Sequence, residues 1–418
     1  MTSAPGETLS SVDSPDTLAS VAEAIELSAS IGLVYVSDSD PGISRVKKGE
    51  RFAYLNTDER TLRDAKALQR IASLAIPPAY TDVWICKHER GHLQATGHDV
   101  RGRKQYRYHP EWRTARDSAK FERMIAFGEA LPRLRRRIAR DLNLTGLPRD
   151  KVLAVVVSLL DATRIRIGNA EYARDNASFG LTTLKNKHVQ FVREGRARFS
   201  FRGKGGLAHD VTVNDKRLSR IVRRCQDIPG QQLFQYLDDD GVRHPITSDL
   251  VNAYLKDAMG EDFTAKDFRT WSATLSAIGL LAATPLPDAS GQRASERALK
   301  SAIVATIKAV ADELRNTPTV ARKSYINPIV FTAWKSGALH KSVEADFKGA
   351  PRKAEKLALA FLRAETRAQA RTAKRAARAT ASSGQLGPTA KGKRRLRATS
   401  ATRPPAANKP SVAGSGIT

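Results

Sequence analysis

The chain has 418 residues, 41% of them hydrophobic, and a formal net charge of +27. This length allows two or three domains with real cores. So basic a chain, with a pI near 10.3, points to a polyanionic partner, and nucleic acid is the commonest one. No apolar run approaches the roughly 20 residues of a membrane span, and the N-terminus lacks the pattern of an export signal. We therefore expect a soluble, cytoplasmic, nucleoid-associated protein that does not bind membranes.

The two cysteines, Cys86 and Cys225, are far apart in the sequence and form no CxxC pair. This usage predicts a reducing compartment without a disulfide framework. Cys86 is followed by His88, His92 and His98, which raises the alternative of a zinc site. The segment alternates like a strand, however, and no second ligand pair follows at zinc-site spacing, so we predict no metal.

Composition divides the chain into four parts. Residues 1–41 are rich in Ser, Asp and Glu and contain no Lys or Arg, which predicts a disordered acidic lead with one weak helix near 17–28. Residues 42–117 predict a small β-rich domain. Its expected elements are a helix near 60–73 and strands near 49–54, 82–86, 92–96 and 103–108.

The last of these strands alternates polar and basic residues with the rings of Tyr106 and Tyr108. Such a strand suits contact with a nucleic-acid groove, although an edge strand protected by charge is an open alternative. The predicted DNA-binding residues of this domain are Arg101, Arg103, Lys104, Gln105, Tyr106 and Tyr108.

Residues 118–365 predict a larger, mainly helical domain, so the expected class is α+β. The apolar run at 152–160 marks a buried central helix, and 187–213 predicts three strands. Further helices are expected at 119–139, 216–225, 247–259, 266–283, 294–316 and 352–371. After Glu365 the sequence has twelve basic residues and no acidic one, which predicts a disordered basic tail at 366–418 and leaves +15 for the rest.

A tyrosine stands at the end of a short predicted helix, with Arg322 and Lys323 just before it. Thr317 is suited to the N-cap and Pro318 to the first helical position, while Pro328 stops the helix soon after Tyr325. A packed aromatic residue at a helix end is the ordinary explanation for such a tyrosine. A nucleophile aimed at a DNA phosphate is the alternative that other residues favour.

Those residues are Arg166 after the central helix, Lys204 among three glycines at a hairpin tip, Arg269 on a helix, and Asn316. A phenol that attacks a phosphodiester builds charge on the non-bridging oxygens, which two arginines and one neutral donor can hold. A lysine can protonate the departing 5′ oxygen. Reversal by the freed 5′ hydroxyl reseals the strand without ATP, so we predict neither cofactor nor metal.

Several local segments follow one another in a fixed order along the chain. They are residues 95–106, Arg-Ile-Gly-Asn from Arg166, residues 180–188, Phe-Arg-Gly-Lys ending at Lys204, Lys-Asp-Phe-Arg-Thr-Trp around Arg269, and Arg-Lys-Ser-Tyr-Ile-Asn-Pro around Tyr325. In order and local sequence these segments resemble the type IB DNA topoisomerases, most closely the small poxvirus-like enzymes of bacteria. The resemblance spans roughly residues 42–363. One departure is Asn316, where many members have histidine, and an asparagine cannot act as an acid.

The resemblance implies a monomeric enzyme that relaxes supercoiled double-stranded DNA through a 3′-phosphotyrosine. It implies an N-terminal DNA-clamping domain and a catalytic domain of the fold shared with tyrosine recombinases, and adds Lys266 as a DNA contact. A tyrosine site-specific recombinase is the alternative within that fold. Lys266 and Arg269 form Lys-x-x-Arg where recombinases usually have His-x-x-Arg, which favours the topoisomerases. A non-catalytic, histone-like protein would explain the basic tail but not the placing of Lys204 and Tyr325.

Overall fold

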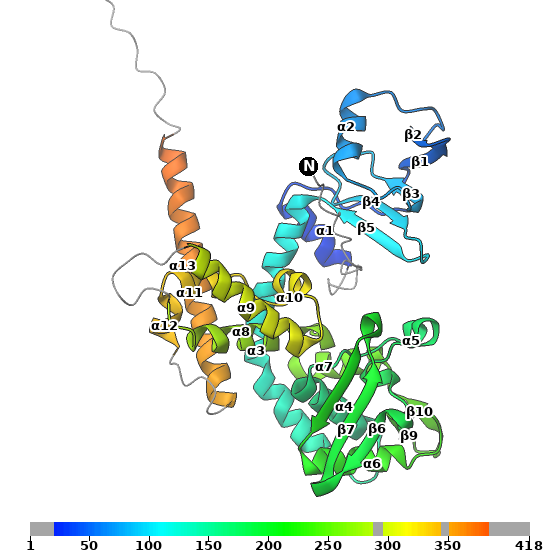
Figure 1. Ribbon diagram of the computed structural model, residues 1–418, viewed down its shortest axis with the longest axis vertical. Coiled ribbons are helices and arrows are strands. Elements are labelled where there is room, and N and C mark those ends of the chain that lie inside the picture. The colour runs from blue at the N-terminus through cyan, green and yellow to red at the C-terminus, as the bar shows by residue number, and fades with distance from the viewer. Residues whose placement is uncertain (1–20, 287–295, 344–350, 384–418) are drawn as a thin grey trace, which may run out of the picture. The chain divides into compact units, whose positions relative to one another are not determined.

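The N-terminal domain is a five-stranded antiparallel sheet with helices packed against it (Figure 1). The computed structural model describes residues 21–286, 296–343 and 351–383. The strands lie in the order β2-β1-β3-β4-β5. Paired strands are consecutive in the chain, except that β3 pairs with β1 and not with β2. Their bounds are β1 Ile43–Lys48, β2 Arg51–Leu55, β3 Thr81–Ile85, β4 Leu93–His98 and β5 Lys104–Tyr108, and the helices are α1 Val21–Ser30 and α2 Ala65–Ser73.

Ordered structure in this domain begins well before residue 42. Helix α1 buries Ala24, and the segment after it buries Leu33 and Val36 in the same small core. The prediction of a disordered lead through residue 41 is therefore wrong for 21–41, because its few apolar side chains recur at positions that one packed face can bury. The weak helix expected near 17–28 begins four residues later and ends two residues later than predicted, and residues 1–20 lie outside the described part.

A single helix crosses the predicted domain boundary at 117/118. Helix α3, Pro110–Asp141, begins with Pro110 at its first position, and the imidazole of His109 accepts a hydrogen bond from the next amide. Trp112 packs in the core of the N-terminal domain, whereas Met124 and Phe127 pack in the core of the helical domain. The boundary predicted as a junction between domains is thus continuous helix, which begins nine residues before the helix expected at 119–139.

The helical domain is built around α4, Arg149–Thr163. Its side chains from Val152 to Val157 are almost completely buried, as the unbroken apolar run predicted. Helices α3, α6, α7 and α8 all contact it. The remaining helices are α5 Ala170–Asn176, α6 Lys216–Gln226, α7 Ser248–Met259, α8 Ala265–Ala282, α9 Glu296–Leu314, α10 Pro318–Ser324, α11 Ile329–Lys335, α12 Ala338–Ser342 and α13 Pro351–Ser383.

Three antiparallel strands form a second sheet, as predicted for 187–213. They are β6 Val189–Val192, β7 Arg196–Arg202 and β8 Ala208–Val213, in that order. Alternate residues of β7, including Ala197 and Phe199, are buried against the helices. A short antiparallel pair, β9 Gln235–Leu237 with β10 Arg243–Pro245, was not predicted. Each of these strands is very short and adjoins a loop.

The basic tail begins as helix rather than as disordered chain. Helix α13 continues to Ser383, beyond the predicted end of the folded part at residue 365. Its alanine-rich sequence explains this, because alanine is the strongest helix former and long basic side chains lose little freedom in a helix. Residues 384–418 lie outside the described part. None of the described helices is both long and apolar enough to cross a membrane.

Candidate active site

Tyr325 immediately follows helix α10 and is largely buried, with 9% of its surface exposed. Thr317 caps the start of α10 and Pro318 occupies its first turn, as predicted. The amides of Tyr325 and Ile326 both donate to the carbonyl of Ala321, at 3.1 Å each, which ends the helix there. On the far side, the hydroxyl of the fully buried Thr274 donates to the Tyr325 carbonyl at 3.2 Å.

Arg269, on the first turns of α8, lies beside Tyr325 and is only 3% exposed. Its guanidinium carbon lies 5.2 Å from the centre of the Tyr325 ring. Two of its nitrogens donate to carbonyls at the ends of other helices, those of Arg164 after α4 and Leu314 at the end of α9, the latter at 2.8 Å. Helix ends leave carbonyls without partners, so Arg269 both fastens three helices together and places positive charge at the tyrosine.

Arg166 is held on a loop directly after α4. The chain leaves α4 through Arg164 in a left-handed conformation with φ of +58°, and Gly168 follows with φ of +102°. The carbonyl of Arg166 accepts the Leu181 amide at 2.9 Å. A side chain at Gly180 would lie 2.6 Å from that carbonyl, so glycine is needed for the two segments to approach. This contact shows that residues 166–169 and 180–183, which are apart in the sequence, pack directly against each other.

Asn316 lies at the turn between α9 and α10 and joins the same group. Its amide oxygen accepts a hydrogen bond from Nη2 of Arg166. Three buried side-chain N–H groups remain without an acceptor here, namely Nη1 of Arg166, Nε of Arg269 and Nδ2 of Asn316. Unsatisfied buried donors are costly, and a cluster of them beside one tyrosine indicates a place for an anionic oxygen.

Electrostatics around Tyr325 favour its ionised form. Burial by itself would raise the pKa of the phenol. The positive charges of Arg269 and Arg166 outweigh burial and bring the pKa below its ordinary value. The same crowding of charge has a reciprocal effect, since burial and the neighbouring Arg269 lower the pKa of Arg166 to about 10. A negative ligand would oppose both shifts, since it would raise the pKa of Arg166 and that of Tyr325.

Lys204 is at the tip of the β7–β8 hairpin, as predicted. The amide of Gly203 donates to the Leu207 carbonyl at 2.8 Å, which closes the turn, and Gly205 and Gly206 both have φ of +75°. Lys204 is exposed as a whole residue. Loss of hydration and the charge of Arg166 nevertheless lower the pKa of Lys204. Its amine is therefore close enough to interact electrostatically with Arg166.

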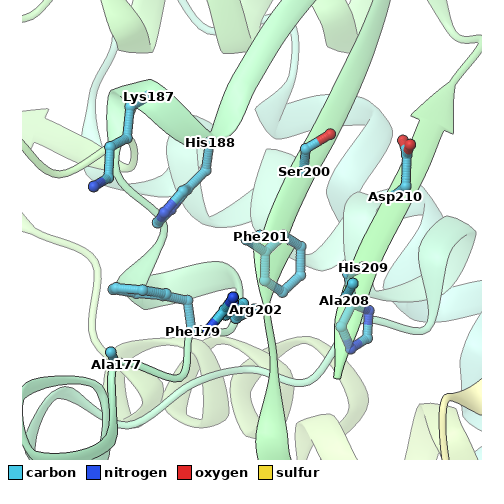
Figure 2. A pocket seen from close by; sticks show the side chains of 10 residues that line it. All are labelled: Ala177, Phe179, Lys187, His188, Ser200, Phe201, Arg202, Ala208, His209 and Asp210. Atoms are coloured by element: carbon cyan, nitrogen blue, oxygen red, sulfur yellow. The ribbon is translucent and has the colours of Figure 1, made fainter. Parts of the chain in front are cut away.

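A pocket of about 520 Å³ lies beside this turn and is lined in part by the adjoining ends of β7 and β8 (Figure 2). Phe201 and His209 stack in it with ring centres 4.8 Å apart and nearly parallel planes. Gly203 is packed so closely on His209 that a Cβ there would lie 2.5 Å from Nε2. Burial first, and then the charge of Arg166, lower the pKa of His209 to about 4, so the ring is neutral and serves as the floor of the Lys204 turn.

The predicted DNA-binding side chains of the N-terminal domain differ in their availability. Arg101 is exposed. Arg103 pairs with Asp99 at 2.6 Å, and Gln105 also donates to Asp99. The first of these contacts lowers the pKa of Asp99 to about 2. Internal carboxylates therefore balance part of this basic strand and fix its side chains in place.

Lys104 is balanced in the same way by Asp38, with nitrogen and oxygen 2.5 Å apart. Asp38 also accepts from the hydroxyl of Thr96 at 3.0 Å, so the segment predicted to be disordered supplies the carboxylate. Lys266, the remaining predicted DNA contact, stands at the start of α8 one turn before Arg269, and its charge lowers the pKa of Tyr325.

The two tyrosine rings of this strand lie on the side that packs against the N-terminal core. Tyr108 is 8% exposed and packs with Trp112 and Leu93 in the N-terminal core, where Tyr106 lies against it as a stacked ring 6.1 Å away. Strand alternation placed the two rings on one face correctly, but that face points to the core. Tyr108 is therefore a core residue of this domain, and its contact with DNA stays a prediction.

Two of the four possible zinc ligands, Cys86 and His92, pack inside the N-terminal domain. Cys86 is buried, and Nδ1 of His92 accepts the Val36 amide at 3.1 Å. Within residues 21–286, 296–343 and 351–383, no three His, Cys, Asp or Glu side chains come together as metal ligands.

Two neighbours of Tyr325 were missed by the sequence analysis. Thr274 is a small polar residue in an apolar helix, and Lys120 is one of many basic residues on α3. Lys120 donates to the carbonyl of Ser324, next to the tyrosine. Neither carries a local signal, because their importance comes from contacts across 51 and 204 residues of sequence.

Comparison with known proteins places this site in a family. Residues 109–345 match the model of the eukaryotic DNA topoisomerase I catalytic core, and residues 51–99 match the N-terminal domain of bacterial DNA topoisomerase IB. The chain is 32% identical to DNA topoisomerase 1B of Acanthamoeba polyphaga mimivirus over 68% of its own length and 85% of the relative's. It is 24% identical to DNA topoisomerase 1B of Vaccinia virus (strain Copenhagen) over 67% of its length and 86% of the relative's.

Both parts of the molecule are covered by these matches. The catalytic-core match contains Arg166, Lys204, Arg269 and Tyr325, and the N-terminal match covers strands β2 to β4. The α+β arrangement of a β-sheet domain and a mainly helical domain agrees with them. The chain belongs to the type IB DNA topoisomerases, and its N-terminal domain is of the bacterial kind.

Proposed function

We propose that this enzyme relaxes positive and negative supercoils by cutting and resealing one strand of duplex DNA through a 3′-phosphotyrosine at Tyr325. The observation that carries this proposal is the cluster of three buried, unpaired N–H groups on Arg166, Arg269 and Asn316 beside a buried tyrosine of lowered pKa. A phosphate oxygen would supply the acceptor that these donors lack.

The positions of the side chains support the following roles. Tyr325 loses its phenolic proton to solvent, which the charges of Arg269 and Arg166 favour. The phenolate attacks the phosphorus, and its oxygen replaces the 5′ oxygen of the next nucleotide. Arg166, Arg269 and Asn316 hold the non-bridging oxygens, on which charge builds in the transition state. Two permanent positive charges supply most of this stabilisation, and the neutral Asn316 donates a hydrogen bond without providing a proton.

Lys204 is assigned to the leaving group. An alkoxide is a poor leaving group at neutral pH, so the 5′ oxygen must be protonated as its bond to phosphorus breaks. The glycines of the turn allow the hairpin tip to approach the backbone of DNA, and the lowered pKa of Lys204 makes its proton easier to transfer. In the reverse step the neutral amine takes the proton back and the 5′ hydroxyl releases Tyr325.

A relaxation assay on negatively and positively supercoiled plasmid, with EDTA and without ATP, tests this proposal. The enzyme should relax both substrates to completion, because neither ATP nor a divalent cation is used in any step. A requirement for ATP, or activity only on a specific recombination site, would contradict it.

Arg166→Ala is expected to slow cleavage by about 10²-fold, the usual scale for the loss of one transition-state donor. The protein should remain folded, since Arg166 bonds only to Asn316 among the side-chain contacts described.

Arg269→Ala should slow cleavage and also lower the melting temperature, because the carbonyls of Arg164 and Leu314 lose their donor. Rapid-quench cleavage and thermal melting of both variants check this contrast. Equal melting temperatures for the two variants would show that Arg269 has no structural part.

Removal of the chain after Arg371 is expected to weaken the salt dependence of DNA binding without slowing cleavage. The deleted part carries ten basic residues and no acidic one, and fewer neutralised phosphates mean that fewer counterions are released on binding. The fold should be preserved, since the buried positions Phe361 and Leu362 of α13 precede the cut. DNA affinity measured from low to high salt checks this, and an unchanged slope would show that the tail does not bind DNA.

A further inference from the structure

Lys120 connects α3 to the residue before the nucleophile. It lies on the third turn of α3 and is partly buried. Its Nζ donates to the carbonyl of Ser324, the last residue of α10. The same nitrogen lies 4.8 Å from the ring centre of Phe121 and 5.9 Å from that of Tyr325. A basic residue 204 positions before Ser324 in the sequence therefore contacts both the backbone and the ring at the tyrosine.

We propose that Lys120 is a positioning residue for the cleavage reaction, which fixes the end of α10 and thereby orients the Tyr325 phenol. This inference rests on the proposed role of Tyr325 as nucleophile. It differs from the roles of Arg166, Arg269, Asn316 and Lys204, because Lys120 acts through the protein and needs no contact with the phosphate.

Helix geometry explains why such a contact is needed. Helix α10 has only seven residues, and its last carbonyls have no partner within the helix. A lysine ammonium at the negative end of a helix is a favourable partner for such a carbonyl. Thr274 already holds the carbonyl of Tyr325. With Lys120 on Ser324, the two carbonyls that flank the nucleophile along the chain are both fixed.

The cost of placing Lys120 there argues against a chance contact. Burial, followed by the charge of Lys266 on α8, lowers the pKa of Lys120 to about 7. Asp117 on its own helix and Asp267 on α8 oppose this effect, while Arg116 adds to it. A lysine on a solvated helix face would keep its ordinary pKa. The interactions of Lys120 with the Ser324 carbonyl and with the two aromatic rings offset this cost.

The test compares Lys120→Met with Lys120→Arg and with a control, Lys323→Met. Methionine keeps the unbranched chain but neither donates nor carries charge, and arginine keeps both properties. Lys323 is an exposed neighbour on α10, so its removal deletes the same charge nearby without the Ser324 contact. For each variant we would measure the rate constant of covalent adduct formation at saturating DNA, the affinity for DNA, and the melting temperature.

Lys120→Met should form adduct about 10- to 100-fold more slowly, since small misplacements of a reacting group have effects of this size. Its DNA affinity should stay within about two-fold, Lys120→Arg should recover most of the rate, and Lys323→Met should keep the parental rate constant. A parental rate constant in Lys120→Met would overturn the proposal, as would a slower rate that reduced affinity fully explains. If Lys120→Met is unfolded, Lys120→Arg decides alone, and a folded arginine variant slower than one tenth of parental overturns it. Absence of adduct with the parental enzyme would instead refute the proposed function.

Discussion

Tyr325→Phe is expected to bind duplex DNA with nearly parental affinity and to form no covalent adduct at any time or pH. The substitution removes one oxygen from a ring that is 9% exposed and leaves its packing volume almost unchanged. The contacts that hold the backbone, from Thr274 and Lys120, do not involve the hydroxyl. Binding and catalysis should therefore separate completely in this variant.

The measurement is a denaturing gel of labelled duplex incubated with the variant, beside a binding assay under the same conditions. Phe331→Leu would control for a change of an aromatic residue on the neighbouring helix α11, and it should retain adduct formation. Adduct formed by Tyr325→Phe would mean that another residue is the nucleophile, and the assignment of the whole site would then fail.

Lys204→Ala is expected to cleave ordinary DNA about 10³-fold more slowly, within the range for loss of a general acid. A substrate with sulfur in place of the bridging 5′ oxygen should restore most of the rate. The thiolate has a much lower pKa than the alkoxide and leaves without a proton. A matched hairpin change, Arg202→Ala, removes a nearby exposed charge and should have a small effect that is equal on both substrates.

An equal defect of Lys204→Ala on oxygen and sulfur substrates would contradict the general-acid assignment. Lys204 would then act only as a positive charge near the phosphate, a role that does not depend on the leaving group. The assignments of Tyr325, Arg166 and Arg269 would be unaffected. The lowered pKa of Lys204, whose first cause is loss of hydration, makes proton transfer the expectation.

Local sequence signals predicted the elements of the site well. The cap at Thr317 and Pro318, the apolar run of α4 and the glycines around Lys204 each have a mechanism that acts within a few residues, and the structure has those elements there. The side chains named as candidates, Arg166, Arg269, Asn316 and Tyr325, are brought together.

Features that depend on tertiary contacts could not be predicted in the same way. The face of β5 that carries Tyr106 and Tyr108 was identified, but alternation alone does not say which face meets the core. The acidic composition of 21–41 hid a packed segment, because a few buried positions are enough to order a chain that is polar elsewhere. The role proposed for Lys120 depends on a contact with Ser324, which no sequence pattern near either residue indicates.

The central claim is that a 3′ phosphate of DNA becomes bonded to Tyr325, and mapping of the trapped adduct tests it most directly. Duplex DNA would be cleaved by the parental enzyme, denatured before religation, and digested with protease and nuclease for mass spectrometry. The account predicts a nucleotide joined through its 3′ phosphate to the peptide containing Tyr325, with a free 5′ hydroxyl on the other DNA end. A phosphate linked through the 5′ side, or attached to any other residue, would contradict it.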